Sequence, residues 1–169
     1  MNTEERNWYA LAVRSRHEFV ASDELRRKGV DAFLPSFMKL SRWKDRKKRV
    51  EFPLFPGYLF VHVAPHPEEF LRVVRTRGSV KLVSSEPGRP APVSADEIDS
   101  LKILVQSGEQ FDVYPHLTAG TRVRVKRGPL AGAEGVLSER EDRNVFLVNI
   151  DILGRSVGMK IYAEDIEHA

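Results

Sequence analysis

Cysteine is absent from this 169-residue chain, which excludes disulfide bonds and thiolate metal sites. No run of apolar residues is long enough to span a lipid bilayer, and the polar segment 1–7 is unlike a secretory signal. The length leaves room for one or two domains with a modest core each. We therefore expect a soluble protein of the cytoplasm that has no contact with a membrane.

Recognisable catalytic constellations are missing as well. The chain holds no Gly-rich phosphate loop and no nucleophile elbow. Its five histidines are scattered, and although His62 and His66 have helical spacing, Pro65 and Pro67 prevent the helix that would bring them to one metal ion. We expect a protein without enzymatic activity, cofactor or metal.

Charge is distributed unevenly along the chain. Residues 1–105 carry 19 Lys and Arg against 14 Asp and Glu, whereas residues 106–169 carry 8 against 10. The first part could therefore favour a polyanion, and the second part has no such bias.

The most informative stretch is segment 53–63. Pro53 and Pro56 force the residues before them into extended conformation, and Gly57 allows a sharp turn. A strand then follows with alternating faces. One face is aliphatic and belongs in a core; the other is aromatic. Either the strand is buried on both faces, or the aromatic face is left open for a partner. The aromatic set comprises Phe55, Tyr58 and Phe60.

The elements around this strand predict an α+β domain with an antiparallel sheet. A strand at 8–14 is followed by Ser15 and Glu18, which match a capping box that opens a helix ending at Gly29. Further on, the sequence predicts a helix from Pro67, a strand at 80–83 and a second capping box from Ser94 to Glu97. We expect the three helices to cover one face of the sheet and to leave its aromatic face available.

Segment 39–49 is a basic run between two extended segments. Seven of its eleven residues are Lys or Arg, and only Asp45 is acidic. The pattern predicts a hairpin-like loop, which is either a solvated tip or, with Trp43 at its centre, a contact for a phosphate backbone.

The last third of the chain changes character. Segment 106–117 has neither helical nor strand periodicity and is interpreted as a linker. Short strands at 121–126, 133–137, 145–150 and 156–161, separated by turn residues, predict a small β-barrel rather than helices. The expected domains are 1–105, a linker at 106–117 and a barrel at 118–169.

With both parts in view, the chain resembles the NusG family of transcription elongation factors over almost its whole length. The resemblance rests on the Trp8-Tyr9 pair, on Leu54-Phe-Pro-Gly-Tyr-Leu-Phe-Val61, on the Arg77-Gly78 step and on Pro92-Val-Ser before a helix. Segment 120–135 is similar to a KOW motif. A KOW motif also occurs in ribosomal proteins, so a ribosome-associated RNA-binding protein is the alternative; the net acidic charge of 106–169 counts against it.

The resemblance implies that the N-terminal domain binds the clamp helices of RNA polymerase and suppresses pausing and termination. By matching position, Phe55, Tyr58 and Phe60 would line the polymerase-facing depression. Arg14 and Arg77 would lie near the non-template DNA strand. Independently of the resemblance, the charge of the basic run makes Arg42, Lys44, Lys47 and Lys48 candidate nucleic-acid contacts. The KOW barrel would recruit a ribosomal protein or the terminator Rho through Ile152, Leu153 and Arg155.

The sequence also departs from the family pattern. Ala12 stands where some specialised members have an aromatic residue, and Glu69-Phe-Leu-Arg72 replaces their polar segment that touches the opposite pincer of the polymerase. Pro53-Leu54 before the turn is more similar to the specialised antitermination paralogues than to the housekeeping factor of the family. We therefore expect a monomeric, specialised paralogue.

Overall fold

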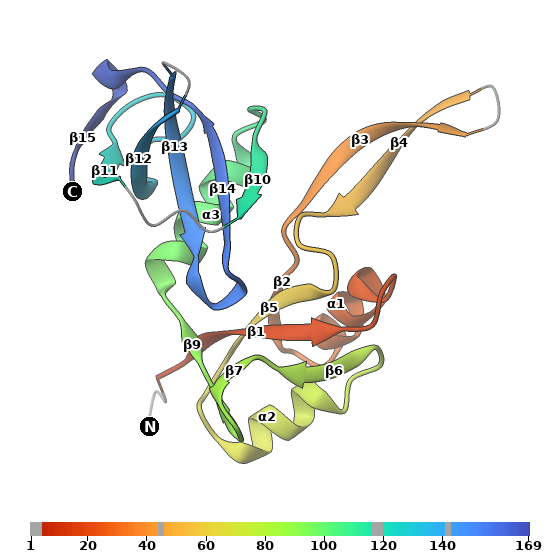
Figure 1. Cartoon of the computed structure of the whole chain (residues 1–169). Coiled ribbons are helices and arrows are strands. Elements are labelled where there is room, and N and C mark those ends of the chain that lie inside the picture. Colours follow the sequence, from red (N-terminus) through yellow and green to blue (C-terminus); the bar gives the residue numbers. More distant parts are fainter. Residues whose placement is uncertain (1–4, 44–45, 116–119, 141–142) are drawn as a thin grey trace. The chain divides into compact units, whose positions relative to one another are not determined.

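A computed structural model describes residues 5–43, 46–115, 120–140 and 143–169. The chain divides into two compact units, residues 1–92 and 93–169 (Figure 1), and each is described by itself. Within the described ranges, no helix is long and apolar enough to cross a membrane.

The N-terminal unit is built on an antiparallel sheet with the strand order β2-β5-β1-β6. Its helices α1 and α2 each connect two strands of this sheet, and two small hairpins, β3-β4 and β7-β8, branch from it (Figure 1). The elements are β1 (Asn7–Val13), α1 (Glu18–Arg27), β2 (Asp31–Phe33), β3 (Ser36–Trp43), β4 (Arg46–Pro53), β5 (Tyr58–Val63), α2 (Pro67–Val74), β6 (Ser79–Leu82), β7 (Ser84–Glu86) and β8 (Arg89–Pro90).

The two faces of this sheet differ in composition. Strand register places Leu11 opposite Leu59 and Tyr9 opposite Val61, so the aliphatic side chains of β1 and β5 share one face. Helices α1 and α2 bury this face with Ala21, Leu25, Val73 and others, to form the core. The other face carries the even-numbered residues of β1 and β5, among them Trp8, Tyr58 and Phe60, whereas Tyr9 lies with the core residues.

The C-terminal unit is a six-stranded antiparallel sheet with the order β10-β14-β13-β12-β11-β15, which confirms the predicted all-β second half. We call it the C-terminal sheet. Strand β9 (Pro92–Val93) lies at the boundary of the two units and is not part of this sheet. The elements of the C-terminal unit are α3 (Ala95–Gln106), β10 (Asp112–Pro115), β11 (Thr121–Val125), β12 (Glu134–Arg140), β13 (Arg143–Ile150), the 3₁₀ helix η1 (Asp151–Leu153), β14 (Arg155–Lys160), the 3₁₀ helix η2 (Ala163–Asp165) and β15 (Ile166–His168).

Two segments differ from the sequence-based expectation. Within the predicted linker 106–117, residues Asp112–Pro115 form β10 and pair with β14. Helix α3 was expected on the N-terminal sheet, yet it belongs to the second compact unit and packs against β12 and β13. The domain boundaries of 105 and 118 remain predictions; the packing places the division of the structure at 92/93.

Neither predicted capping box forms. Helix α1 has His17 at its N-cap position and α3 has Ser94, and neither makes a side-chain cap hydrogen bond. The carboxylate of Glu18 instead accepts a hydrogen bond from the N–H of Gly57 at 3.0 Å, and Glu97 lines a small pocket together with Asp151. Both glutamates therefore lie against segments distant in the sequence rather than capping their own helices.

Candidate functional site

Three loops meet at one end of the N-terminal sheet, and two glycines allow their approach. The N–H of Val13 donates to the carbonyl of Gly57, and the N–H of Arg14 donates to the carbonyl of Gly78, each at 2.8 Å. Both glycines have positive φ, 85° and 86°, which favours glycine. A Cβ on Gly78 would lie 2.9 Å from the Cβ of His17, so this crossing has no room for a side chain.

This junction gathers positive charge. Arg14 and Arg77, both predicted as nucleic-acid-proximal, are exposed and lie on loops joined by the Arg14–Gly78 hydrogen bond. Sequence reasoning missed Arg16 and Arg75, which are exposed in the same two loops. Each lies two positions from a predicted arginine, and this proximity in sequence could have identified it. We call these four residues the basic corner. Guanidinium groups stay ionised at physiological pH, so the corner presents permanent positive charge to an anionic partner.

The second feature is the aromatic face, the side of the sheet that carries Trp8, Phe33, Tyr58, Phe60 and His62. The ring of Phe60 is stacked near Phe33 at 6.2 Å and meets the edge of Phe55 at 6.3 Å. Trp8 stacks on His62 at 4.7 Å. Sequence reasoning named only Phe55, Tyr58 and Phe60; the contributions of Trp8 and Phe33 depend on strand pairing.

Burial separates the three predicted docking residues. Phe55 and Phe60 are fully buried, rather than exposed as the sequence analysis expected, because they pack on each other and on neighbouring rings. Tyr58 is half-buried. Of the three, Tyr58 therefore has the side chain that solvent reaches, and the other two form the packed base of the aromatic face.

The predicted basic hairpin exists as β3-β4, a two-stranded ribbon that extends away from the sheet of its own unit (Figure 1). Lys47 and Lys48 are exposed on β4. The backbone register of the ribbon pairs Arg42 with Lys47 and Ser41 with Lys48. Lys44 lies outside the described residues. At the base of the β3-β4 ribbon, the rings of Phe37 and Phe52 stack with their centroids 6.0 Å apart.

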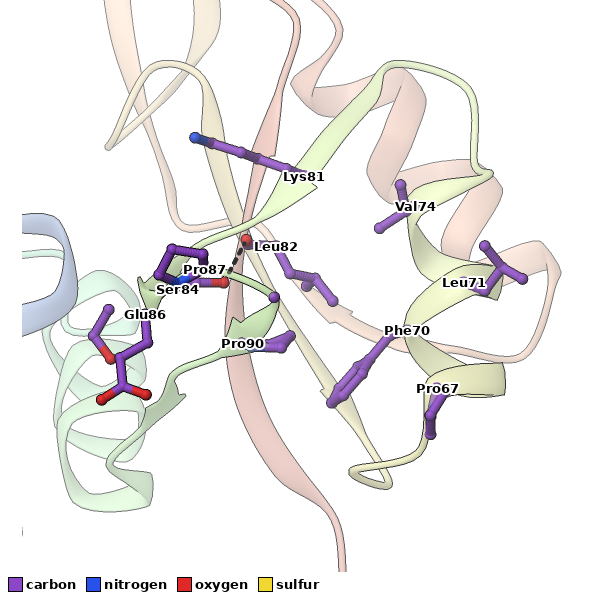
Figure 2. Close-up of a pocket in the computed structure, with 12 residues that line it drawn as sticks. Pro67, Phe70, Leu71, Val74, Lys81, Leu82, Ser84, Glu86, Pro87 and Pro90 are labelled. Carbon is purple, nitrogen blue, oxygen red and sulfur yellow. Dashed lines mark hydrogen bonds between the residues drawn. The ribbon is translucent and has the colours of Figure 1, made fainter.

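An apolar groove of about 810 Å³ lies between α2 and the β6–β8 region. Figure 2 shows Phe70 directed from α2 toward Leu82 and Pro90, with Ser84 bonded to the carbonyl of Leu82. The segment 69–72, which departs from the polar pattern of the family, therefore contributes apolar side chains to this groove.

In the C-terminal unit, the predicted partner residues occupy the β13–β14 connection. Ile152 and Leu153 are half-buried in η1, and Arg155 begins β14 opposite Ile150. Gly154 between them has φ of 61°, a left-handed conformation that closes this turn. The structure thus brings the three residues into one loop.

Neighbouring charges or burial shift the pKa values of three groups among the described residues, Glu97, Arg124 and Glu134. Among the described residues, no three His, Asp or Glu side chains are grouped so as to hold a metal ion; His116 lies outside them. The Arg124 guanidinium lowers the pKa of Glu134 below its ordinary value, and Glu134 in turn raises the pKa of Arg124. Burial and the neighbouring Asp151 carboxylate raise the pKa of Glu97 to about 7.

An α+β unit with an aromatic face and a basic corner, followed by a small antiparallel sheet, defines a two-module binding protein. Residues 6–102 match the family model described as transcription termination factor nusG. Because this match covers more than half of the chain, the protein belongs to the NusG family, and its function is that of the non-enzymatic transcription termination/antitermination factors.

Individual relatives agree with this assignment. The transcription termination/antitermination protein NusG of Borreliella burgdorferi is 25% identical over 181 aligned residues, which cover 96% of this chain and 98% of the relative. The NusG protein of Neisseria meningitidis serogroup B is 28% identical over 124 residues, with 72% and 70% covered. A solved structure that concerns domain interaction in Thermotoga maritima NusG is also similar, with a TM-score of 0.52 and 23% sequence identity. This match covers 96% of this chain and 97% of that one. The last comparison confirms the predicted fold class.

Proposed function

We propose that this protein binds bacterial RNA polymerase through the aromatic face of its N-terminal unit and, on the clamp helices, suppresses pausing and termination. The observation that carries the proposal is the position of Tyr58, the solvent-reachable docking residue on a face whose aromatic neighbours are packed beneath it. Family membership supports the transcriptional role.

The division of the sheet into two faces supports this choice of surface. Helices α1 and α2 already cover the aliphatic face with the core residues, and on the other face Trp8 and Phe60 are buried as well whereas Tyr58 is only half-buried. Tyr58 would contact the polymerase through its ring and hydroxyl. Phe55 and Phe60 would act by holding Tyr58 in place, since their own side chains are buried.

The basic corner is proposed to lie near the exposed non-template DNA strand. The family resemblance supports this role for Arg14 and Arg77. Arg16 and Arg75 are included because they are exposed in the same two loops. The β3-β4 ribbon would add contacts to nucleic acid through Arg42, Lys44, Lys47 and Lys48. These groups neutralise phosphate charge and position the protein without reading sequence.

The C-terminal sheet is proposed to bind a second protein, either a ribosomal protein or Rho, through Ile152, Leu153 and Arg155. The observation in favour is that η1 places all three in one turn-bounded loop. Two apolar residues beside one guanidinium suit a protein partner better than a phosphate backbone.

We further propose that the protein is a monomeric, cytoplasmic and specialised antitermination paralogue rather than the general factor. Pro53-Leu54 before the Phe-Pro-Gly-Tyr turn supports this assignment. The replacement of a polar segment by Glu69-Phe-Leu-Arg72 implies that the contact with the opposite polymerase pincer differs from that of other specialised members.

The decisive experiment measures binding of the full-length protein to RNA polymerase, comparing wild type with Tyr58→Ala. If Tyr58 is a hot spot, its loss should cost roughly 2 kcal/mol, or about thirtyfold in Kd, with little dependence on salt. Tyr162→Ala is the matched control, because Tyr162 is 74% exposed in the other unit. Wild-type affinity in Tyr58→Ala would reject the aromatic face as the docking surface.

A further inference from the structure

Strand register places two charged residues on the aromatic face, one at each edge of the N-terminal sheet. At one edge, Lys81 of β6 is paired with Ala12 of β1, which is paired in turn with Tyr58 of β5. Residues directly opposite each other in an antiparallel pair lie on the same face, so Lys81 shares the face of Tyr58. Its side chain is exposed, and Figure 2 shows it directed away from Phe70 and Val74 of α2, the helix on the other face.

The opposite edge of the aromatic face carries a carboxylate. Asp31 of β2 is paired with His62 of β5, which is paired in turn with Trp8 of β1. The ring of His62 stacks on the buried Trp8 with the centroids 4.7 Å apart, and its Nδ1 lies 3.6 Å from Oδ2 of Asp31. The Asp31 side chain nevertheless remains 57% exposed. The carboxylate therefore lies beside a packed ring pair and is still open to a partner.

These two charges lie at diagonally opposite ends of the aromatic face. The sheet order β2-β5-β1-β6 separates Asp31 from Lys81 by three strand spacings, or about 14 Å. Along β5, the row of His62 lies four residues from the row of Tyr58, or about 13 Å. The backbone positions of the two charged residues are thus on the order of 20 Å apart, and the buried Phe60 lies between the two rows.

A charge at each end gives the aromatic face a direction. An apolar surface by itself lets a partner dock either way round, whereas opposite charges at its two ends favour one way. We propose that Asp31 and Lys81 set the orientation of the protein partner on the aromatic face. The partner presents a basic group to Asp31 and an acidic group to Lys81, on the order of 20 Å apart. This inference rests on the proposed function, in which the aromatic face docks on helices of the polymerase.

The charges on these two strands also have a purely structural explanation. Strands β2 and β6 end the order of the sheet, and charged residues on edge strands discourage pairing between the edges of two molecules. Protection of an edge needs a charge of either sign, whereas orientation of a partner needs Asp31 to be negative and Lys81 to be positive. Exchange of the two charges therefore separates the two explanations.

The test measures binding of the full-length protein to purified core RNA polymerase without nucleic acid, so that the basic corner has no DNA to contact. The double variant Asp31→Lys with Lys81→Asp keeps the net charge and every aromatic residue. Rim charges act mainly on association and its salt dependence, so the association rate at about 50 mM salt should fall on the order of tenfold. The deficit should shrink to about twofold at about 0.5 M salt, because ions screen exposed charges.

The matched control is the double variant Asp23→Lys with Arg27→Asp. It exchanges two exposed charges on helix α1, which covers the other face of the same sheet, and should associate like the wild type. Asp31→Asn and Lys81→Gln each remove one charge with little change in shape, and each should slow association about threefold at low salt. Thermal unfolding followed by circular dichroism shows whether each variant is folded; if the exchange variant is not, the two single variants decide.

Wild-type association of the folded exchange variant, or an equal deficit in the control, would overturn the inference. Faster association would overturn it as well, since the charges of the partner would then lie the other way round. Tyr58→Ala distinguishes this failure from that of the proposed function. If Tyr58→Ala weakens binding while the exchange variant binds like the wild type, only the orientation is rejected. If Tyr58→Ala keeps wild-type affinity, the docking surface is rejected and the orientation with it.

Discussion

The carboxylate of Glu18 and the backbone N–H of Gly57 form a hydrogen bond of 3.0 Å across 39 positions of the chain. Glu18 is only 5% exposed, so the bond ties the start of α1 to the turn that precedes β5. This turn leads directly into Tyr58. The first residue of a helix thus supports the segment from which the proposed docking residue emerges.

Removal of this carboxylate should destabilise the N-terminal unit. Glu18→Ala leaves the Gly57 N–H without its acceptor in a part-buried site, which typically lowers the free energy of unfolding by about 1–3 kcal/mol. Glu18→Gln keeps a carbonyl acceptor and should lose less. Urea denaturation measures both, with Glu24→Ala in the same helix as the control. If Glu18→Ala is no less stable than the control, the bond does not support the turn.

Gly78 and Gly88 form a natural pair for separating strain from steric conflict. Both have positive φ, 86° and 78°, so replacement by alanine should cost each about 1–2 kcal/mol of unfolding free energy. At Gly78 the new Cβ would also meet His17 at 2.9 Å, whereas nothing lies within 4 Å at Gly88. We expect Gly78→Ala to be less stable than Gly88→Ala by at least about 1 kcal/mol in thermal or urea denaturation. Equal stabilities would contradict this steric cost and would show that the loop at 14–18 moves aside for the new Cβ with little loss of stability.

The basic corner should contribute to binding through charge alone. Replacing both Arg14 and Arg77 by alanine should make the affinity for a transcription complex with an exposed non-template strand less dependent on salt. The slope of log K against log salt concentration should fall by about 0.7 for each lost phosphate contact. Arg27→Ala with Arg89→Ala removes the same charge from exposed sites elsewhere in the N-terminal unit. An unchanged slope in the Arg14 and Arg77 variant, or the same decrease in the control, would contradict a specific role for the corner.

The Arg124–Glu134 pair gives a prediction for the C-terminal unit. Arg124 lowers the pKa of Glu134 below its ordinary value through hydrogen bonding and charge, so Arg124→Ala should raise that pKa. A carbon-13 NMR titration of the Glu134 carboxyl group measures the change. Because a lowered pKa stabilises the folded state at neutral pH and this effect is lost on acidification, the variant should also show a weaker loss of stability in acid. Arg127→Ala, which removes a different ion pair with Asp165, should leave the titration of Glu134 unchanged.

Most strands of the molecule can be predicted from the residues that form them and their immediate neighbours. Pro53, Pro56 and Gly57 restrict the backbone before β5, and the alternation that begins at Tyr58 predicted Tyr58–Val63, the bounds that the structure has. Local pattern also predicts the basic hairpin and four strands of the C-terminal sheet, although the bounds of those four strands differ from β11, β12, β13 and β14 by up to about three residues; it misses β10 and β15. These features are predictable because steric limits on φ and ψ and the two-residue period of a strand act within a few positions.

The capping boxes show where local pattern stops being sufficient. Ser15 and Glu18, and Ser94 and Glu97, match the same short motif, yet Glu18 binds the distant Gly57 N–H and Glu97 lines a pocket together with the distant Asp151. A carboxylate near a helix start can accept hydrogen bonds from local or from distant donors. The motif contains only the local ones, so it cannot predict which distant backbone amide or side chain folding brings to the carboxylate.

By itself, then, the sequence determined the element order, the two faces of β5, the uneven charge and the family resemblance. Tertiary structure alone decided that Phe55 and Phe60 are buried while solvent reaches Tyr58, that Arg16 and Arg75 join the basic corner, and that α3 packs against β12 and β13. The physical reason is that backbone preference and periodicity act along the chain, whereas burial and the choice of a polar partner depend on which distant segments pack together.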